Sequence, residues 1–442
     1  MTSSPEILNE AGRDRETLVS YAYSYPHKSS YRKLDPSVAI SEAWQHEDQS
    51  RLALYAHIPF CEMRCGFCNL FTQAQPDSDR VQLYLESLHR QMSVVREQLP
   101  QARFVTAAIG GGTPTYLAPA ALQELLTAIE ETFDFSFRDV PTSVETSPAT
   151  ATRERLEILS QHGIQRISIG IQSFLEHETN AFGRPQQSFQ VQSALELIQL
   201  FEFPVLNIDL IYGSPMQSRQ SWLESLRIAL QAHPDELYLY PLYIRPETGL
   251  ARTGHGPSDH RIDLYRAGRD FLLAAGYEQI SLRCFRRPDL QDSTSYTCQR
   301  DGMVGLGCGA RSYTRQLHYA TRFAVTQAGV RAILDDWMNL SDREFARATH
   351  GIWLTAEEQC RRFVILSLLQ ASGLCLADYL AAFGSSPWDD IPGLLTLQAL
   401  EWLCEDAGKL HLTDAGIENS DVAGPLLYSH DVRQRLREFA RI

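Results

Sequence analysis

Short apolar runs alternate with longer amphipathic stretches between residues 52 and 243. The apolar runs predict strands at Leu52–Phe60, Phe104–Ile109, Ser143–Thr146, Arg166–Gln172, Val205–Tyr212 and Glu236–Tyr243. The stretches between them have helical spacing and predict helices at Val81–Leu99, Ala118–Phe133, Thr152–His162, Ser188–Phe201 and Ser218–Ala232. This alternation is typical of βα units around a parallel sheet, and about six units are visible, two fewer than in a closed eightfold barrel. Functional residues in such sheets lie at the carboxyl ends of the strands.

The two flanks of this region follow other patterns. Residues 1–50 are polar and irregular, with an aromatic and basic segment that includes Tyr21, Tyr25 and His27 and can cover the mouth of a barrel or serve as an ordinary strap. After residue 255 the pattern predicts a helix at Arg261–Ala275, a strand at Tyr277–Phe285, a glycine-rich turn region at Gly302–Ala310 and mostly helices beyond. We therefore expect an N-terminal arm or lid (1–50), a core barrel (51–255), a barrel-completing, substrate-facing segment (256–325) and a helical C-terminal domain with a winged-helix-like end (326–442).

Composition places the chain among globular proteins. Of its 442 residues 44% are hydrophobic and 21% charged, which is enough apolar material for a large core. Acidic residues outnumber basic ones by 54 to 40, and a net charge of −14 repels phosphate backbones and anionic lipids. No stretch approaches the roughly 18 apolar residues of a membrane span, and the first thirty residues lack the pattern of a secretion signal. We expect a cytoplasmic protein that binds neither nucleic acid nor a membrane.

Three of the nine cysteines lie together directly after the first predicted strand, at Cys61, Cys65 and Cys68. The odd number and uneven spacing of the cysteines suit a metal site better than a disulfide framework. Three thiolates on one loop can bind one face of an iron–sulfur cube and leave one iron open. A structural zinc ion would need a fourth ligand at comparable spacing, and His57 precedes the loop on the strand. Zinc and unliganded core cysteines are the alternatives.

The C-x3-C-x2-C spacing, with aromatic Phe67 before the third cysteine, resembles the radical S-adenosylmethionine superfamily. Further segments resemble its oxygen-independent coproporphyrinogen III oxidase and heme chaperone branch: Tyr55–Cys61, Gly110–Thr115, the strand with Glu145, Ser168–Ser173 and Asn207–Gly213. The N-terminal phrase Tyr23–Lys28 resembles a poorly characterised bacterial subgroup of that branch. The resemblance implies a partial (β/α)6-type barrel and a [4Fe-4S] cluster held by Cys61, Cys65 and Cys68. It also implies S-adenosylmethionine, bound at the open iron and cleaved to a 5′-deoxyadenosyl radical.

The resemblance also assigns residues to S-adenosylmethionine, as one or two molecules. It implies that a first molecule contacts Tyr55, Gly111 and Glu145, and that a second contacts Phe67, Gly112, Thr113, Gln172, Arg184 and Asp209. Taken alone, the glycines predict an ordinary turn, and an arginine and an aspartate at such positions form a structural ion pair about half the time. The implied partners are a small-molecule substrate of tetrapyrrole type and a reductase or flavodoxin-like electron donor. Arg283, Arg286 and Arg287 can meet substrate carboxylates or belong to a solvated loop.

Two departures from the branch bear on the reaction. Leu70 stands where the oxidase has a further cysteine, and Asp292–Thr297 keeps only Tyr296 of the chaperone's His-Asn-x-x-Tyr-Trp heme motif. The resemblance therefore implies a radical S-adenosylmethionine oxidoreductase that resembles coproporphyrinogen dehydrogenase, acting by oxidative decarboxylation in porphyrin biosynthesis, or a radical methyltransferase. A heme carrier without turnover is the alternative, and a zinc-stabilised nucleic-acid module is a third class that the acidic composition disfavours.

Overall fold

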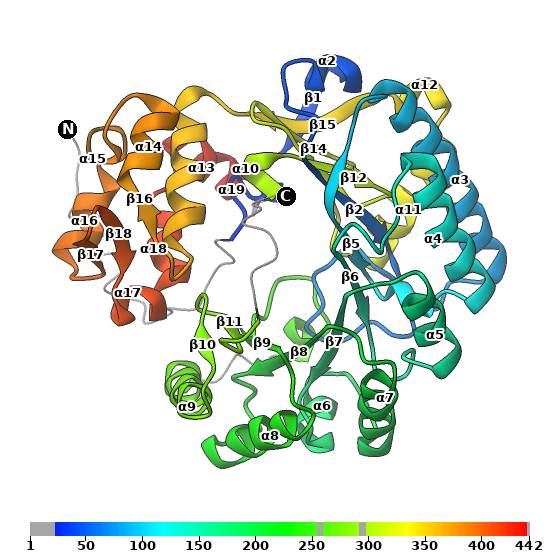
Figure 1. The fold of residues 1–442 in the computed structure, drawn as a ribbon, viewed down its shortest axis with the longest axis horizontal. Coiled ribbons are helices and arrows are strands. Elements are labelled where there is room, and N and C mark those ends of the chain that lie inside the picture. The colour runs from blue at the N-terminus through cyan, green and yellow to red at the C-terminus, as the bar shows by residue number, and fades with distance from the viewer. Residues whose placement is uncertain (1–22, 254–259, 291–297, 440–442) are drawn as a thin grey trace.

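A large, mostly parallel sheet with helices on its outer face forms the greater part of the molecule (Figure 1). The computed structural model describes residues 23–253, 260–290 and 298–439. Six parallel strands follow one another in the sheet and end within two residues of their predicted bounds: β2 (Leu52–Ile58), β5 (Phe104–Gly111), β6 (Thr142–Thr146), β7 (Arg166–Gln172), β8 (Val205–Tyr212) and β9 (Glu236–Pro241). The predicted alternation of strands and helices is thereby confirmed.

The predicted helices between these strands are also present. They are α3 (Ser78–Gln98), α4 (Pro119–Phe133), α5 (Arg153–Gln161), α7 (Ser188–Leu200) and α8 (Arg219–Gln231), and the short α6 (Glu176–Ala181) follows β7. Helix α3 begins earlier than predicted because Asp77 caps its first turn by accepting a hydrogen bond from the Arg80 amide at 2.8 Å. Ile167, Ile169 and Ile171 of β7 are fully buried, whereas Gly170 between them is partly accessible. The outward face of the sheet is thus packed against helices, and its inner face borders the site.

Further strands, most of them antiparallel, extend the parallel sheet at both edges. On the β2 side, β12 (Met303–Leu306) pairs in parallel with β2 and is followed by β13 (Arg311–Tyr313), β14 (Leu317–Ala320), β15 (Arg347–Trp353) and β1 (Arg32–Ala39). On the β9 side lie β11 (Cys284–Arg286) and β10 (Glu278–Gln279). Two predictions are wrong in detail. The region predicted as turns contains β12, and the single strand predicted at Tyr277–Phe285 is two short strands because the chain reverses where the Ile280 amide bonds to the Cys284 carbonyl at 2.8 Å.

A second hydrophobic cluster, here called the C-terminal core, lies beside the barrel and includes Val364, Ile365, Leu394 and Leu410. Its elements are α13 (Ala356–Leu368), β16 (Leu374–Cys375), α14 (Leu376–Phe383), α15 (Pro387–Asp390), α16 (Gly393–Ala399), β17 (Leu403–Asp406), β18 (Lys409–Leu412), α17 (Asp414–Glu418), α18 (Ser420–Leu426) and α19 (His430–Phe439). It is mainly helical, as predicted, with one small sheet ordered β16-β18-β17. Within the three described ranges, every helix is too short or too polar to span a bilayer.

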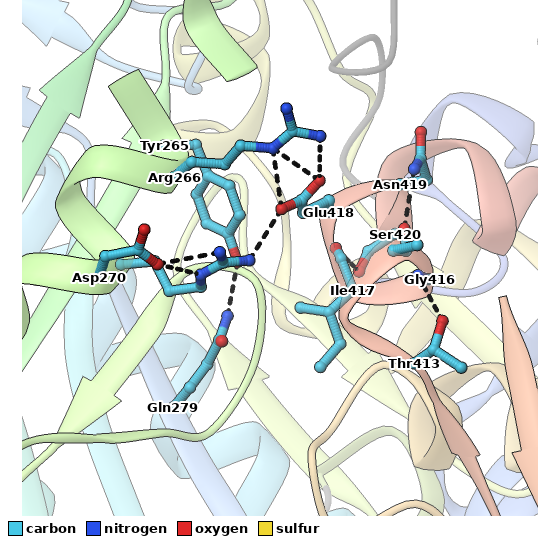
Figure 2. Close-up of polar contacts among 12 residues, drawn as sticks. Tyr265, Arg266, Asp270, Gln279, Thr413, Gly416, Ile417, Glu418, Asn419 and Ser420 are labelled. Carbon is cyan, nitrogen blue, oxygen red and sulfur yellow. Dashed lines mark hydrogen bonds and ion pairs between the residues drawn. The ribbon is translucent and has the colours of Figure 1, made fainter. Parts of the chain in front are cut away.

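Polar contacts join the C-terminal core to the barrel. Figure 2 shows Arg266 of α9 (Arg261–Ala274) directed at the carboxylate of Glu418, with an N–O distance of 2.8 Å. Arg269 of the same helix also pairs with Glu418 at 2.8 Å. Deeper in the molecule, Arg283 donates to Asp421 of α18 at 2.7 Å, and both side chains are almost fully buried. These contacts fix the C-terminal core against the β9–β11 side of the sheet.

Candidate functional site

The carboxyl ends of the parallel strands bring the predicted site residues to one edge of the sheet. The cysteine loop follows β2, Gly111 ends β5, Glu145 lies near the end of β6, and Gln172 ends β7. Glu145 is exposed although it lies deep in the protein, where burial raises the pKa of its carboxyl to about 7. A side chain that is surrounded by protein and still accessible faces an internal space. The sheet edge therefore borders a solvent-accessible interior.

Backbone hydrogen bonds hold the cysteine loop in place. Cys61 belongs to the short strand β3 (Phe60–Cys61), which pairs with β4 (Gln73–Ala74). Gly66 donates to the Phe182 carbonyl at 3.0 Å and accepts from the Leu250 amide at 2.8 Å. A Cβ atom at Gly66 would lie 2.7 Å from the Phe182 oxygen, so only glycine fits this close approach. The loop is thus anchored to segments that follow β7 and β9.

The three thiols of the loop influence one another. Burial, together with the neighbouring Cys68 and Cys65 thiols, raises the pKa of Cys61 to about 12. Burial also raises the pKa of Cys65, although Arg184 opposes this by donating to its sulfur at 3.2 Å. Thr113 donates to the Cys61 sulfur at 3.8 Å. Crowded buried thiols release their protons when a metal binds them, so the loop has the chemistry of a metal ligand set.

No three His, Cys, Asp or Glu side chains among the described residues surround the position of a single metal ion. A single zinc ion would need its ligands at about 2.0–2.3 Å from one point. An iron–sulfur cluster does not need this, because each cysteine binds a different iron.

The glycines at the end of β5 and directly after it are required by close packing. A Cβ atom at Gly110 would lie 2.6 Å from the Glu145 carboxylate, and one at Gly111, whose φ is +113°, would lie 2.4 Å from the His57 ring. The Gly111 amide donates to Glu145 Oε2 at 3.0 Å. The Gly112 amide donates to the Ile58 carbonyl at 2.8 Å, which ties this turn to the start of the cysteine loop. The glycines therefore bring the carboxylate, the imidazole and the cysteine loop together.

His57 positions Tyr55 from within the protein. One ring nitrogen lies 3.1 Å from the Tyr55 hydroxyl and the other lies 3.0 Å from the Phe71 carbonyl. Burial lowers the pKa of His57 to about 4, which leaves the ring neutral. The structure thus gives His57 two partners within the barrel and leaves Tyr55 partly accessible from the interior.

Asp209 of β8 is held by a small polar network that the sequence analysis did not single out. The Asn207 amide donates to its carboxylate at 2.8 Å, and the Ser168 hydroxyl lies 3.5 Å away. Burial raises the pKa of Asp209 to about 6, and these two hydrogen bonds oppose the rise. Ser168 and Asn207 both lie in the segments that carried the family resemblance, and their inward direction on adjacent strands is the signal that could have identified them.

Gln172 and Arg184 approach each other through Gly170. Arg184 donates to the Gly170 carbonyl at 2.8 Å as well as to Cys65, and the Gln172 amide nitrogen lies 2.8 Å from where a Gly170 Cβ would be. Gln172 has a φ of +71°, a left-handed conformation that is uncommon outside glycine. Phe67 packs edge-on against Phe182 with ring centroids 6.1 Å apart. The structure thus brings Arg184 to the cysteine loop, which contains Phe67, and places Gln172 beside Gly170, which Arg184 also contacts.

Three arginines considered for substrate carboxylates already have acidic partners. Arg283 pairs with Asp421, Arg286 with Glu236 at 2.9 Å and Arg287 with Asp289 at 2.6 Å. Tyr21 and Asp292–Thr297 lie outside the described residues.

Comparisons with known proteins agree with this arrangement. A model of the radical SAM superfamily matches residues 55–229, and a model of the HemN C-terminal domain matches residues 354–418. Heme chaperone HemW of Escherichia coli (strain K12) is 33% identical over 267 residues, covering 59% of this chain and 69% of that protein. Oxygen-independent coproporphyrinogen III oxidase of the same strain is 28% identical over 384 residues, covering 80% of this chain and 81% of that protein.

A solved structure confirms the predicted fold. Coproporphyrinogen III oxidase (HemN) from Escherichia coli superposes with a TM-score of 0.77 at 24% identity, covering 90% of this chain and 96% of that one. Together with the family models and the relatives, the fold shows that the chain belongs to the radical SAM superfamily, in the branch that contains heme chaperone HemW and the oxygen-independent coproporphyrinogen III oxidases.

Proposed function

We propose that the chain is a radical SAM enzyme that cleaves S-adenosylmethionine reductively and acts on a carboxylate-bearing, tetrapyrrole-type substrate. The superfamily uses a [4Fe-4S] cluster and S-adenosylmethionine. When bound and reduced, they supply a 5′-deoxyadenosyl radical that abstracts a hydrogen atom. The observation that carries the proposal is the meeting of three neighbouring thiols, two of them with a raised pKa, with two inward carboxylates at one edge of the sheet.

The donor set fits the cluster. We assign Cys61, Cys65 and Cys68 as its ligands, since their loop is anchored on both sides and Cys68 lies close enough to the other two to help raise the pKa of each. Arg184 supports this by donating to Cys65 at 3.2 Å, because a cation beside a thiolate favours its ionised form. Thr113 gives Cys61 a comparable hydrogen bond.

The inner face of the sheet fits a cationic cofactor. We assign Tyr55, Gly111 and Glu145 to a first S-adenosylmethionine, because an accessible carboxylate fixed by the Gly111 amide suits an ammonium group or a ribose. We assign the remaining residues to a second molecule of S-adenosylmethionine: Phe67, Gly112, Thr113, Gln172, Arg184 and Asp209. Each inward carboxylate has polar neighbours that fix its direction, Gly111 for Glu145 and Asn207 for Asp209.

The two departures from the relatives narrow the reaction. Leu70, which replaces a cysteine of the oxidase, has 49% of its surface exposed and offers no acid or thiol. Decarboxylation would therefore proceed without that cysteine, and methyl transfer from a second S-adenosylmethionine is the other outcome. The two reactions differ in their products, since methyl transfer releases S-adenosylhomocysteine beside 5′-deoxyadenosine.

Anaerobic reconstitution tests the proposal. The protein is reduced with dithionite in the presence of S-adenosylmethionine and coproporphyrinogen III, and the nucleosides are separated by chromatography. We expect 5′-deoxyadenosine from the wild type and from Cys404→Ala, a control at an exposed cysteine of β17, but not from Cys65→Ala. An intact, reducible wild-type cluster that gives no 5′-deoxyadenosine would overturn the proposal.

Heme carriage is the second candidate, because HemW relatives are among the most similar proteins. It predicts a Soret band that survives desalting after heme is added. Loss of heme on desalting would reject it.

A further inference from the structure

The N-terminal segment Tyr23–Tyr31 lies between the C-terminal core and the open side of the sheet (Figure 1). Tyr25 is fully buried in the C-terminal core, where its hydroxyl donates to Glu358 and accepts from the Ser429 amide. Its own amide donates to Gln299 at 3.0 Å. The segment is therefore fixed from both sides, and the residues that follow Tyr25 are held at defined positions.

Lys28 lies in this segment and is the first residue of the short helix η1 (Lys28–Ser30). Its ammonium lies 3.7 Å from the centroid of the Phe323 ring. Burial and the nearby Arg311 lower the pKa of Lys28 to about 7, yet the side chain keeps part of its accessible surface. Like Glu145, Lys28 therefore faces the internal space.

Two arginines from other parts of the chain carry further positive charge to the same region. Burial lowers the pKa of His27 to about 3, with further contributions from Lys28, Arg311 and Arg245, so all four groups lie within electrostatic range. Arg311 begins β13 and donates to the Ser24 hydroxyl at 3.1 Å, and Arg245 follows β9. Among the described residues, neither Lys28 nor Arg311 forms an ion pair with an aspartate or glutamate, whereas Arg245 lies within electrostatic range of Asp421.

Tyrosines line this group of cations. Burial alone would lower the pKa of Arg311, but Tyr313, Tyr31 and Tyr55 hold it above its usual value. The Arg311 guanidinium lies 5.7 Å from the Tyr313 ring centroid. The Tyr31 hydroxyl is buried and has no hydrogen-bond partner in the described part of the chain. A flat aromatic ligand with acidic groups would find both ring contacts and donors here.

The cations lie next to the proposed cofactor site. Cys68 interacts electrostatically with Lys28, and Tyr55 does so with Arg311. Buried cations without anionic partners are costly, and a bound anion removes that cost. We propose that Lys28, Arg245 and Arg311, with the hydroxyl of Tyr31, form an anion site that binds a carboxylate of the substrate beside the cysteine loop. This inference rests on the proposed function and names the contacts that its substrate makes.

Binding can be measured without radical chemistry. The reconstituted full-length protein is titrated with coproporphyrin III, a fluorescent tetracarboxylate, and with its tetramethyl ester. We expect Lys28→Met and Arg311→Met to weaken coproporphyrin III binding by about 10-fold to 100-fold each, the loss typical of a charge-assisted hydrogen bond. Lys33→Met is the matched control, because Lys33 lies just after the segment, on β1, and is exposed. The affinity of this variant should equal that of the wild type.

The remaining arms separate a lost contact from a lost fold and identify the anion. Arg311→Lys should retain most of the affinity and the melting temperature of the wild type. The ester should bind the wild type and both methionine variants equally. Coproporphyrin III binding that is unchanged in the two methionine variants, or absent from the wild type, would overturn the inference, as would displacement of the porphyrin by millimolar inorganic phosphate, which would indicate a phosphate site. Each of these results is independent of 5′-deoxyadenosine formation, so the two proposals fail in different assays.

Discussion

The buried ion pair between Arg283 and Asp421 gives a quantitative test of how the C-terminal core is held. Arg283 lies just before β11, and Asp421 lies in α18. Their N–O distance is 2.7 Å, and the side chains are 3% and 0% exposed. Arg283 also lies 4.7 Å from the Tyr23 ring, so the pair contacts the segment that carries Lys28.

Asp421→Asn keeps the size of the side chain and removes its charge. The Arg283 cation is then left without its counter-charge in a site that water does not reach, which costs about 3–5 kcal/mol. For a chain of 442 residues, an unfolding entropy of about 2.1 cal/mol/K per residue converts this loss into a melting temperature about 3–5 °C lower. Arg283→Met combined with Asp421→Leu removes both charges and should recover most of the loss, because neither charge then has to be desolvated.

The assay is thermal unfolding followed by far-UV circular dichroism, at equal protein concentration for all variants. Asp289→Asn is the control, since Asp289 forms an ion pair of similar length, 2.6 Å, with Arg287 at the surface, where such pairs contribute about 0–1 kcal/mol. The reasoning is refuted if Asp421→Asn has the same melting temperature as the control, or if the double variant has a lower melting temperature than Asp421→Asn.

Three further outcomes are expected. Gly112→Ala should lower the iron content of the reconstituted protein, because the added Cβ would lie 2.5 Å from the Phe60 carbonyl oxygen. Gly384→Ala, a control at a positive φ with nothing within 4 Å, should leave the iron content unchanged. Equal iron contents in the two variants would contradict the packing argument. Coproporphyrin III affinity should fall as the pH rises through about 7, because Lys28 is charged only below its lowered pKa and faces Arg311, His27 and Cys68. Lys28→Met should lose this pH dependence. A pH dependence that persists in the variant would point to another group. Glu418→Gln should lower stability by about 1–3 kcal/mol in denaturant titrations, because two arginines lose a mostly buried partner, and an unchanged midpoint would show that the contacts in Figure 2 do not hold the C-terminal core.

The parallel strands were predictable because their apolar runs are long and both faces of the sheet are covered, so local pattern and final environment agree. Strand β1 was not predictable from the sequence, although it has eight residues. Its pairing with β15 is interrupted between Lys33 and Val38, around Pro36, so no period of two survives in the sequence. The short strand β12 was hidden by the glycines in and around it. Gly305 within the strand is required because its Cβ would lie 2.3 Å from the Arg311 carbonyl oxygen.

The candidate site, like the fold, has parts that the sequence predicts and parts that it does not. The cysteine loop and the glycine turn are local motifs, so their positions at the strand ends followed from the βα pattern. The partners of the arginines are distant in sequence, and nothing local distinguishes Arg283, which pairs with Asp421, from Arg311, which lies among tyrosines. Lys28 lies in a stretch without periodicity, and only the packing of Tyr25 into the C-terminal core shows where it points.

The pairing of β1 with β15 also sets an order of assembly. During synthesis, residues 32–39 have no partner strand until residues 347–353 have left the ribosome, and Tyr25 has no pocket until the C-terminal core has folded. The cysteine loop and the six parallel strands need neither event. The loop to which we assign the cluster can therefore be complete before the proposed substrate contacts are in place, which leaves a period in nascent chain folding when iron and sulfide would have direct access to the loop.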